Sequence, residues 1–235
     1  MTKSTILFDL GGTLADYYTM SEFPLILEQA TKEVQLYLNG KDLLKVPPDL
    51  IAQRVHEEDH DSADYRSRPL EERLTRIFDL EASMAGSDTL TEMCDRFMGP
   101  IFARGKLYED TMPSLKELKE NEFRMAIVSN TSWGSPATPW RREIRRLGLD
   151  AYMNAIVLDR DVGWRKPSRR IFEFAMKNLR VTPNECLFVG DEPKWDLIGP
   201  RAVGMEALLI DRRGTMLDVE ERPIRSLREL TLRLQ

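Results

Sequence analysis

The sequence has few cysteines and no long apolar run, and each shortage excludes a class of protein. Its 235 residues include only Cys94 and Cys186, too few for a disulfide framework or a cysteine-based metal site. No apolar run approaches the roughly 20 residues that a membrane-spanning helix needs. The first residues lead directly into a predicted strand without the pattern of a signal peptide. We therefore expect a protein of the reducing cytoplasm that has no membrane partner.

The chain also lacks an excess of basic residues, which argues against nucleic acid as a partner. It has 34 lysines and arginines against 39 aspartates and glutamates, a formal net charge of -5, whereas nucleic-acid surfaces are usually basic. Hydrophobic residues make up 42% of the sequence, which is enough for the core of a globular protein. This length suits one large domain, or a core domain with a smaller appendage, as a monomer or a homodimer.

Residues 4–16 contain the first candidate for an active site. Residues 6–8 form an apolar run without polar alternation, which is typical of a strand buried on both faces. The run ends at Asp9, and open α/β sheets bind ligands at the carboxyl ends of their strands. Two glycines then permit a tight turn whose backbone N–H groups lie near this carboxylate. Asp9 could be a nucleophile, a metal ligand, both, or only the cap of the turn.

The rest of the chain divides into a helical segment and an alternating part. Between residues 17 and 105 the apolar residues recur at helical spacing, Pro48, Pro69 and Ser87 mark helix starts, and no convincing strand is found. Four further apolar strands are predicted at residues 123–129, 155–158, 186–189 and 207–210. Because helices alternate with these strands, the pattern predicts βαβ units and a parallel sheet.

Several predicted strands end at reactive side chains. Asp9, Ser129 and Asp191 occupy strand ends, and Lys166 opens a predicted helix after another strand. Because the carboxyl ends of parallel strands share one edge, these residues can converge. Two carboxylates can hold Mg²⁺, and the hydroxyl and amides of Ser129 and Asn130 can hold phosphate oxygens. With a lysine to neutralise charge, the set fits attack of a carboxylate on a phosphomonoester.

These motifs, in this order, resemble those of the haloacid dehalogenase superfamily, in its branch with a helical cap inserted after the first motif. The matching segments are DLGGT from Asp9, Ser129-Asn130, Lys166-Pro167 and GDEPKWD from Gly190. The resemblance implies an α/β, Rossmann-like three-layer core with a parallel sheet, formed by residues 1–15 and 106–235. It also implies a smaller all-α cap domain at residues 16–105.

The resemblance implies an activity and the residues that carry it. The expected enzyme is a Mg²⁺-dependent phosphatase of a small phosphorylated metabolite that works through an aspartyl-phosphate. Asp9 would be the nucleophile, and Ser129 and Asn130 would bind the phosphoryl group. Lys166 would steady both Asp9 and the phosphoryl oxygens.

The same resemblance implies a metal site. Its ligands would be a side-chain oxygen of Asp9, the backbone carbonyl of Gly11 and the carboxylate of Asp191. Asp196 would support this site or pair with Lys166.

Gly11 departs from the family pattern. Phosphatases of the family usually carry a second aspartate there, which protonates the leaving alcohol and activates the hydrolytic water. Glycine keeps the carbonyl ligand but removes this general acid and base, which is typically worth about 10²–10⁴-fold in rate. Activity is therefore expected to be low. Asp16, the nearest downstream carboxylate, could replace the missing group or be a polar residue at the entrance to the cap.

Two other functions stay open at this point. Dehalogenases of the family also lack the second aspartate, although they usually have an aromatic residue there and need no metal. The intact Gly190-Asp191 motif favours metal and phosphate over this alternative. A catalytically weak protein that binds a phosphorylated ligand is the third hypothesis.

Overall fold

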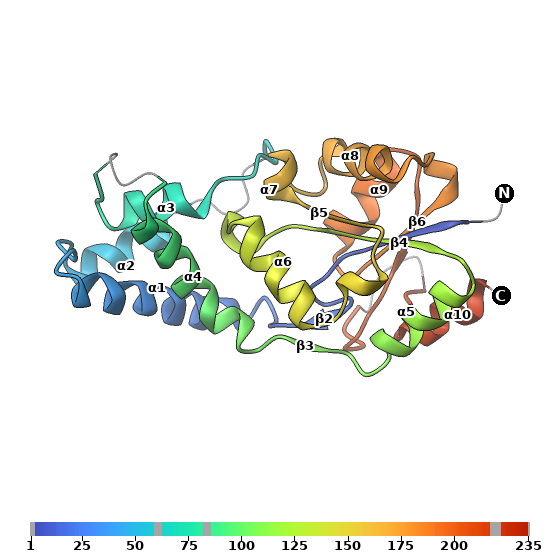
Figure 1. The fold of residues 1–235 in the computed structure, drawn as a ribbon, viewed down its shortest axis with the longest axis horizontal. Helices are drawn as coiled ribbons and strands as arrows, with labels where there is room; N and C mark the ends of the chain where they lie inside the picture. The colour runs from blue at the N-terminus through green and yellow to red at the C-terminus, as the bar shows by residue number, and fades with distance from the viewer. Residues whose placement is uncertain (1–2, 59–62, 82–85, 217–221, 235) are drawn as a thin grey trace.

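The computed structural model describes residues 3–58, 63–81, 86–216 and 222–234, and a parallel sheet lies in the part drawn on the right of Figure 1. The five strands of this sheet are β1 (Thr5–Phe8), β4 (Arg124–Ser129), β5 (Ala155–Leu158), β6 (Cys186–Gly190) and β7 (Glu206–Leu209). Their order across the sheet is β5-β4-β1-β6-β7, and every neighbouring pair is parallel. The predicted α/β fold is therefore confirmed.

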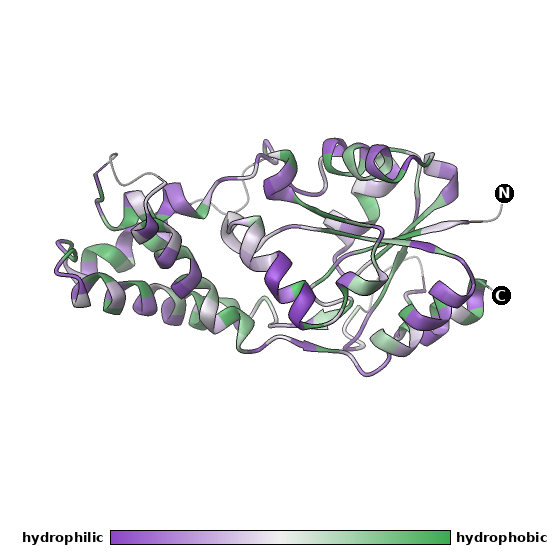
Figure 2. Ribbon diagram, in the orientation of Figure 1, coloured by the Kyte–Doolittle hydropathy of each residue, from purple (hydrophilic) through white to green (hydrophobic). Residues whose placement is uncertain are grey.

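The position of β1 at the middle of the sheet explains its apolar sequence. All four of its residues are buried, as are all five of β6, because helices cover both faces of the sheet. Figure 2 shows the strands of the sheet coloured mostly as hydrophobic. A strand in this position must be apolar on both faces. The carboxyl ends of β1, β4 and β6 consequently lie next to one another at one edge.

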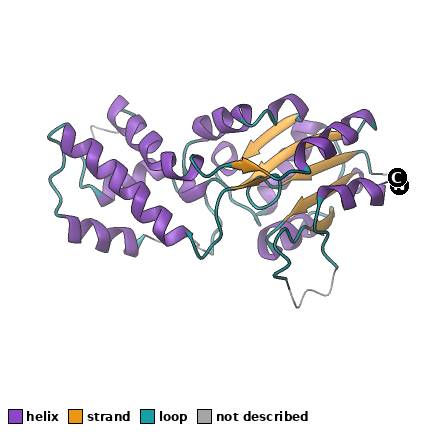
Figure 3. Ribbon diagram, turned by 90° about the horizontal axis from the view of Figure 1, so that it is seen from below, coloured by secondary structure: helices purple, strands orange, loops and turns teal. Residues whose placement is uncertain are grey.

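Helices lie on both faces of the sheet and complete three layers (Figure 3). The helices of this part are α5 (Thr111–Glu120), α6 (Ala137–Arg146), α7 (Asp159–Val162), α8 (Arg169–Leu179), α9 (Ile198–Ala202) and α10 (Leu227–Leu234). Successive residues of a strand point to opposite faces. Accordingly, Leu7 belongs to the apolar cluster that contains Phe172 of α8. Its neighbour Ile6 belongs to the cluster that contains Leu115 of α5 and Leu227 of α10.

A separate group of helices projects from this sheet (Figure 1). Its helices are α1 (Phe23–Gly40), α2 (Pro48–Glu57), α3 (Leu70–Ile77) and α4 (Asp88–Phe102), which we call the helical segment. The buried residues of α1 recur three or four positions apart, at Ile26, Ala30, Val34 and Leu38. This spacing places them on one face of the helix, toward α4. Among the described residues, no helix combines the length and apolar character needed to span a bilayer.

The helical segment meets the α/β part where the chain enters it, where the chain leaves it, and at one further backbone contact. At its two ends, β2 (Ala15–Asp16) and β3 (Lys106–Leu107) pair in antiparallel fashion. Away from its ends, Arg66 and Trp164 form an antiparallel bridge. Next to this bridge the Ser67 amide donates to the Gly163 carbonyl at 3.0 Å, and the Arg165 amide donates to the Tyr65 carbonyl at 2.8 Å.

The structure differs from the sequence-based expectation at several element ends. Strands β2 and β3 and helices α7 and α10 were not anticipated. The helix expected to start at Lys166 begins instead at Arg169, with Ser168 as its N-cap. Lys166 directly precedes Pro167, and the ring of a proline disfavours helical backbone angles at the residue before it. Lys166 therefore lies outside the helix. Helix α9 follows directly on a π-helical turn at Pro193–Leu197.

Candidate active site

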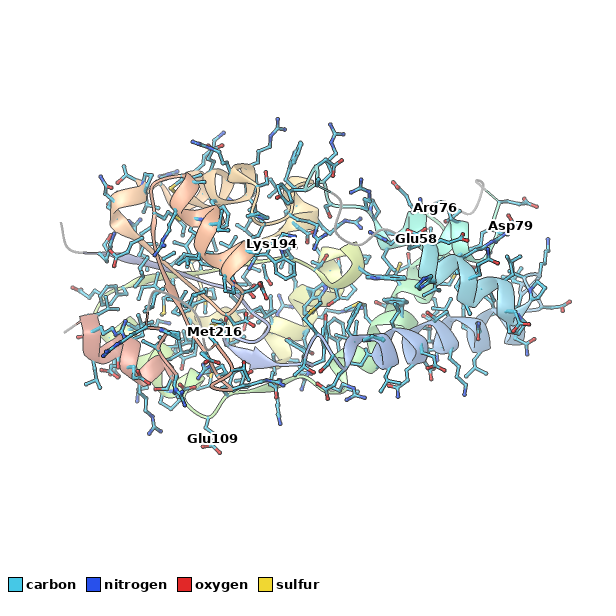
Figure 4. The ribbon with its side chains drawn as sticks, turned by 180° about the vertical axis from the view of Figure 1, so that it is seen from behind. Glu58, Arg76, Asp79, Glu109, Lys194 and Met216 are labelled. Carbon is cyan, nitrogen blue, oxygen red and sulfur yellow. The ribbon has the colours of Figure 1, made fainter. Side chains whose placement is uncertain are left out.

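The reactive residues predicted at separate strand ends line a single cavity of about 430 Å³. Asp9 follows β1, Ser129 ends β4 and Asp191 follows β6, while Lys166 comes from the loop between α7 and α8. Met216, labelled in Figure 4 in the part of the molecule away from the helical segment, lines the same cavity. The shared sheet edge therefore brings together residues that are up to 182 positions apart, from 9 to 191.

Asp9 is held through one of its two carboxylate oxygens. Its Oδ1 accepts a hydrogen bond from the Ser129 hydroxyl at 2.7 Å and lies 2.7 Å from the Lys166 ammonium nitrogen. Among the described residues no side chain donates to Oδ2. Asp9 thus has a fixed orientation and a second oxygen that is not engaged by the described part of the chain.

Lys166 is fully buried and lies between two carboxylates. Its Nζ is 2.7 Å from Asp9 Oδ1 and 2.6 Å from Asp196 Oδ1. Burial opposes the positive charge, but Asp196 and Asp9 outweigh it and raise the pKa of Lys166. The lysine is therefore a permanent cation beside the candidate nucleophile.

Asn130 positions the Lys166 segment. Its Oδ1 accepts from the Lys166 backbone amide at 2.7 Å, and its Nδ2 donates to the Lys166 carbonyl at 3.4 Å. Asn130 lines the cavity, as expected of a phosphoryl-binding residue. Both ends of its side-chain amide nevertheless contact the Lys166 backbone, so the structure shows a positioning role.

Three carboxylates gather beside the cavity and form what we call the acidic cluster. Ligand atoms of Asp9, Asp191 and Asp196 lie within 4.8 Å of one another. Burial, and then repulsion from Asp9 and Asp196, raise the pKa of Asp191 to about 8. Only a 3.4 Å contact from the Thr13 hydroxyl reaches its side chain from the described residues. Among the described residues Asp191 forms no ion pair, whereas Asp9 and Asp196 both pair with Lys166. A set of carboxylate oxygens of this kind suits a cation such as Mg²⁺.

The two glycines after Asp9 have different structural requirements. Gly12 has a φ of +72°, and a Cβ at this position would overlap the Asp191 carboxylate, so only glycine fits. Gly11 lies outside the left-handed region, and a Cβ there would meet only Tyr17 Cδ2, at 3.7 Å. Glycine at position 11 is therefore not required by space or by backbone conformation.

Asp16 is not part of this constellation. One of its oxygens lies 2.9 Å from Arg213 Nη2, and the other lies 3.7 Å from Lys106 Nζ. Asp16 is absent from the described residues that line the cavity. The structure thus brings Asp9, Ser129, Asn130, Lys166 and the acidic cluster together, but it leaves Asp16 paired with Arg213 and Lys106, outside the cavity lining.

Arg212 was missed by the sequence analysis. Its side chain is 6% exposed, and its Nη1 lies 2.7 Å from both carboxylate oxygens of Asp110. Its Nη2 and Nε donate to the Thr13 carbonyl at 2.6 and 3.1 Å. Arg212 therefore fixes the turn that carries Gly11 and Gly12. Its position just after β7 was the available signal, because strand ends were the criterion that selected Asp9.

Comparison with known proteins points to one family. A family model described as haloacid dehalogenase-like hydrolase matches residues 3–204. A glyceraldehyde 3-phosphate phosphatase of Methanopyrus kandleri is 35% identical over 121 residues, covering 52% of this chain and 50% of the relative. The aligned part of the chain thus spans about half the length of that relative.

Two longer matches are to proteins that have different activities. An (S)-2-haloacid dehalogenase of a Pseudomonas species is 26% identical over 93% of this chain and 88% of the relative. A crystal structure of a phosphatase from Thermococcus onnurineus has a TM-score of 0.68 and 25% identity. It covers 100% of this chain and 98% of that one.

Proposed function

The chain belongs to the haloacid dehalogenase-like hydrolases, and we propose that it hydrolyses a small phosphomonoester with Asp9 as the nucleophile. The observation that carries this proposal is the position of Asp9, which is held by Ser129 and Lys166 at 2.7 Å beside the acidic cluster. Phosphoryl transfer depends mainly on positioning and on neutralising negative charge, and this arrangement supplies both.

The proposed reaction has two steps. In the first, Asp9 Oδ2 forms a bond to phosphorus while the bond from phosphorus to the leaving oxygen breaks. Ser129 and Lys166 hold Asp9 in the attacking orientation, and the Lys166 charge stabilises the phosphoryl oxygens. In the second, water attacks phosphorus and the bond from Asp9 Oδ2 to phosphorus breaks, so that inorganic phosphate leaves and the carboxylate of Asp9 is restored. The leaving alkoxide takes one proton from solvent in the first step, and the attacking water returns one in the second.

We propose Mg²⁺ as the cofactor, because the residues present suit it. Asp9, Asp191 and the Gly11 carbonyl would hold the ion, and Asp196 would keep Lys166 in place. When bound, Mg²⁺ would offset the negative charge of the carboxylates and of the phosphoryl group.

We propose that residues 16–105 act as a cap domain on a core of residues 1–15 and 106–235. Tyr17, Tyr18, Thr19 and Met20, from the start of this segment, line the cavity. Apolar and aromatic groups at this position would exclude water from the aspartyl-phosphate until the alcohol has left.

A dehalogenase is the second candidate, and Gly11 together with the Pseudomonas relative favours it. Both reactions would start from a carboxylate such as Asp9. The acidic cluster supports the phosphatase, because three carboxylates near a single lysine leave an excess of negative charge that a cation would balance.

The test is an assay of the purified chain with p-nitrophenyl phosphate and Mg²⁺, in parallel with 2-chloropropionate without metal. We expect phosphate release, and we expect Asp9→Asn to reduce it to background, because an amide is a poor nucleophile. The Asp9→Asn variant should stay folded. Undiminished turnover in that variant would overturn the mechanism, and halide release without phosphate release would identify a dehalogenase.

A further inference from the structure

A second cavity of about 220 Å³ adjoins the first one. The two share Tyr18, Met20, Asn130, Ser132 and Trp195 as lining residues. The second is otherwise lined by Phe23, Arg68, Arg73, Thr131, Trp133, Gly134 and Arg165. The second cavity therefore lies directly beside the space that a phosphoryl group near Asp9 would occupy.

The lining of the second cavity is cationic and aromatic. Three arginines contribute to it, and none of its described lining residues is acidic. The first cavity, in contrast, contains both signs of charge, with Asp9, Asp191, Glu192 and Asp211 beside Lys166, Arg212 and Arg213. The charged lining thus changes from mixed beside Asp9 to basic at the far end.

The arginines come from both parts of the molecule and are anchored there. Arg73 is 3% exposed, and its Nη1 lies 3.0 Å from Glu58 Oε2. Glu58 also pairs with Arg76 at 3.0 Å, and both are labelled in Figure 4. The guanidinium of Arg73 lies 5.4 Å from the centre of the Trp133 ring. These contacts fix the charge of the helical segment at the cavity wall.

Arg165 supplies charge from the α/β part. It directly precedes Lys166, its amide donates to the Tyr65 carbonyl at 2.8 Å, and its guanidinium lies 5.9 Å from the Trp195 ring centre. Arg68, from the helical segment, pairs with Asp64 through both of its Nη atoms, at 3.1 and 3.4 Å, and is partly exposed. The same cavity therefore contains one deeply buried arginine and two that are only partly buried.

We propose that the second cavity binds the leaving group of the substrate, and that this leaving group carries a second anion, a carboxylate or a phosphate. This inference rests on the proposed phosphatase function, whose substrate it specifies. A guanidinium binds either anion through two parallel hydrogen bonds, and bonds to charged groups are the stronger ones. The rings of Trp133, Trp195 and Phe23 would contact the carbon skeleton between the two anions.

The proposal is tested first by binding. The ligands are phosphonates, in which a bond from phosphorus to carbon replaces the bond that the enzyme would hydrolyse. Calorimetry in Mg²⁺ compares phenylphosphonate with its para-carboxy, para-phosphono and para-aminomethyl derivatives. We expect each added anion to tighten binding about tenfold or more, and the added ammonium group to weaken it. A larger gain for the phosphono derivative indicates a phosphate as the natural second anion, and a larger gain for the carboxy derivative indicates a carboxylate.

Two variants and a matched control assign the effect to this cavity. Arg165→Gln and Arg68→Gln each remove one partly exposed guanidinium and should reduce the preference for the second anion several-fold. Arg170→Gln is the control, because Arg170 stacks on Trp164 at 4.1 Å and lies outside the described lining. It should leave the preference unchanged.

The outcomes separate this inference from the proposed function. Equal affinity for charged and uncharged phosphonates overturns the inference, as does a preference that persists in both variants. Hydrolysis of phenyl phosphate without any preference leaves the phosphatase in place and removes the second site. A preference for the second anion in binding, without turnover of any ester, keeps the second site and removes the proposed phosphatase function.

Discussion

Gly11→Asp should raise the rate of the proposed phosphatase reaction, and the gain should depend on the leaving group. The new carboxyl group would stand where it can protonate the departing oxygen. General acid–base catalysis is worth about 10²–10⁴-fold, which bounds the gain for an alkyl phosphate. A nitrophenolate is stable as an anion, so p-nitrophenyl phosphate should gain much less.

The structure indicates that Gly11→Asp will not strain the backbone or destabilise the fold. Position 11 lies outside the left-handed region, and a Cβ there has only an ordinary contact, 3.7 Å from Tyr17 Cδ2. Replacing glycine where the new residue fits commonly stabilises a protein by about 0.4–1 kcal/mol, because the unfolded chain has fewer conformations. The variant should therefore melt at or slightly above the temperature of the parent chain.

The assay measures kcat for ethyl phosphate and for p-nitrophenyl phosphate in parallel. Gly11→Asn is the matched control, because it has the same shape and cannot transfer the proton. Gly12→Asp is the steric control, which should lose activity because its Cβ would overlap the Asp191 carboxylate. If Gly11→Asp keeps its stability and Mg²⁺ affinity but hydrolyses ethyl phosphate no faster than Gly11→Asn, the hypothesis of a missing proton shuttle is refuted.

Three further predictions concern the metal, the Arg212 contacts and the thiols. Mg²⁺ should raise the melting temperature and EDTA should abolish phosphatase activity, because a cation that binds the acidic cluster only in the folded state stabilises it; a melting temperature that stays constant through the titration contradicts this. Arg212→Met should cost about 3–5 kcal/mol in denaturant unfolding by leaving Asp110 buried without its partner, whereas Arg212→Met combined with Asp110→Leu should recover part of it; additive losses would show that the pair is not coupled. Burial raises the pKa of Cys94 to about 12 and that of Cys186 to about 11, so neither thiol should react quickly with Ellman's reagent at pH 8 until the protein is unfolded.

The sheet and much of the reactive constellation were predictable because their signals are local. Each central strand has to be apolar on both faces, so residues 6–8, 123–129 and 186–189 are visible as runs in the sequence. The reactive side chains follow these runs directly, and parallel pairing then brings their ends to one edge. A position at the end of an apolar run was thus enough to select Asp9, Ser129 and Asp191.

The remaining features depend on contacts between residues that lie far apart in the sequence. The spacing of apolar residues carries no information about such contacts. Arg212 meets Asp110 across 102 positions, so its place after β7 could mark it as a candidate but could not identify Asp110 as its partner. The pairing of Asp16 with Arg213 spans 197 positions, so its removal from the cavity could not be anticipated. The second cavity is likewise assembled from five separate stretches of chain, and β2 and β3 are only two residues long.

The antiparallel bridge between Arg66 and Trp164 has a mechanical consequence. The helical segment is attached to the sheet not only where its chain enters and leaves but also at a third point, through backbone bonds at Tyr65 and Ser67. A swing about the β2–β3 pair alone would rupture these bonds. If they hold, any displacement of the helices is transmitted to Arg165 and, one peptide bond further, to Lys166. A substrate that binds against the helices would then shift Lys166, which lies 2.7 Å from Asp9.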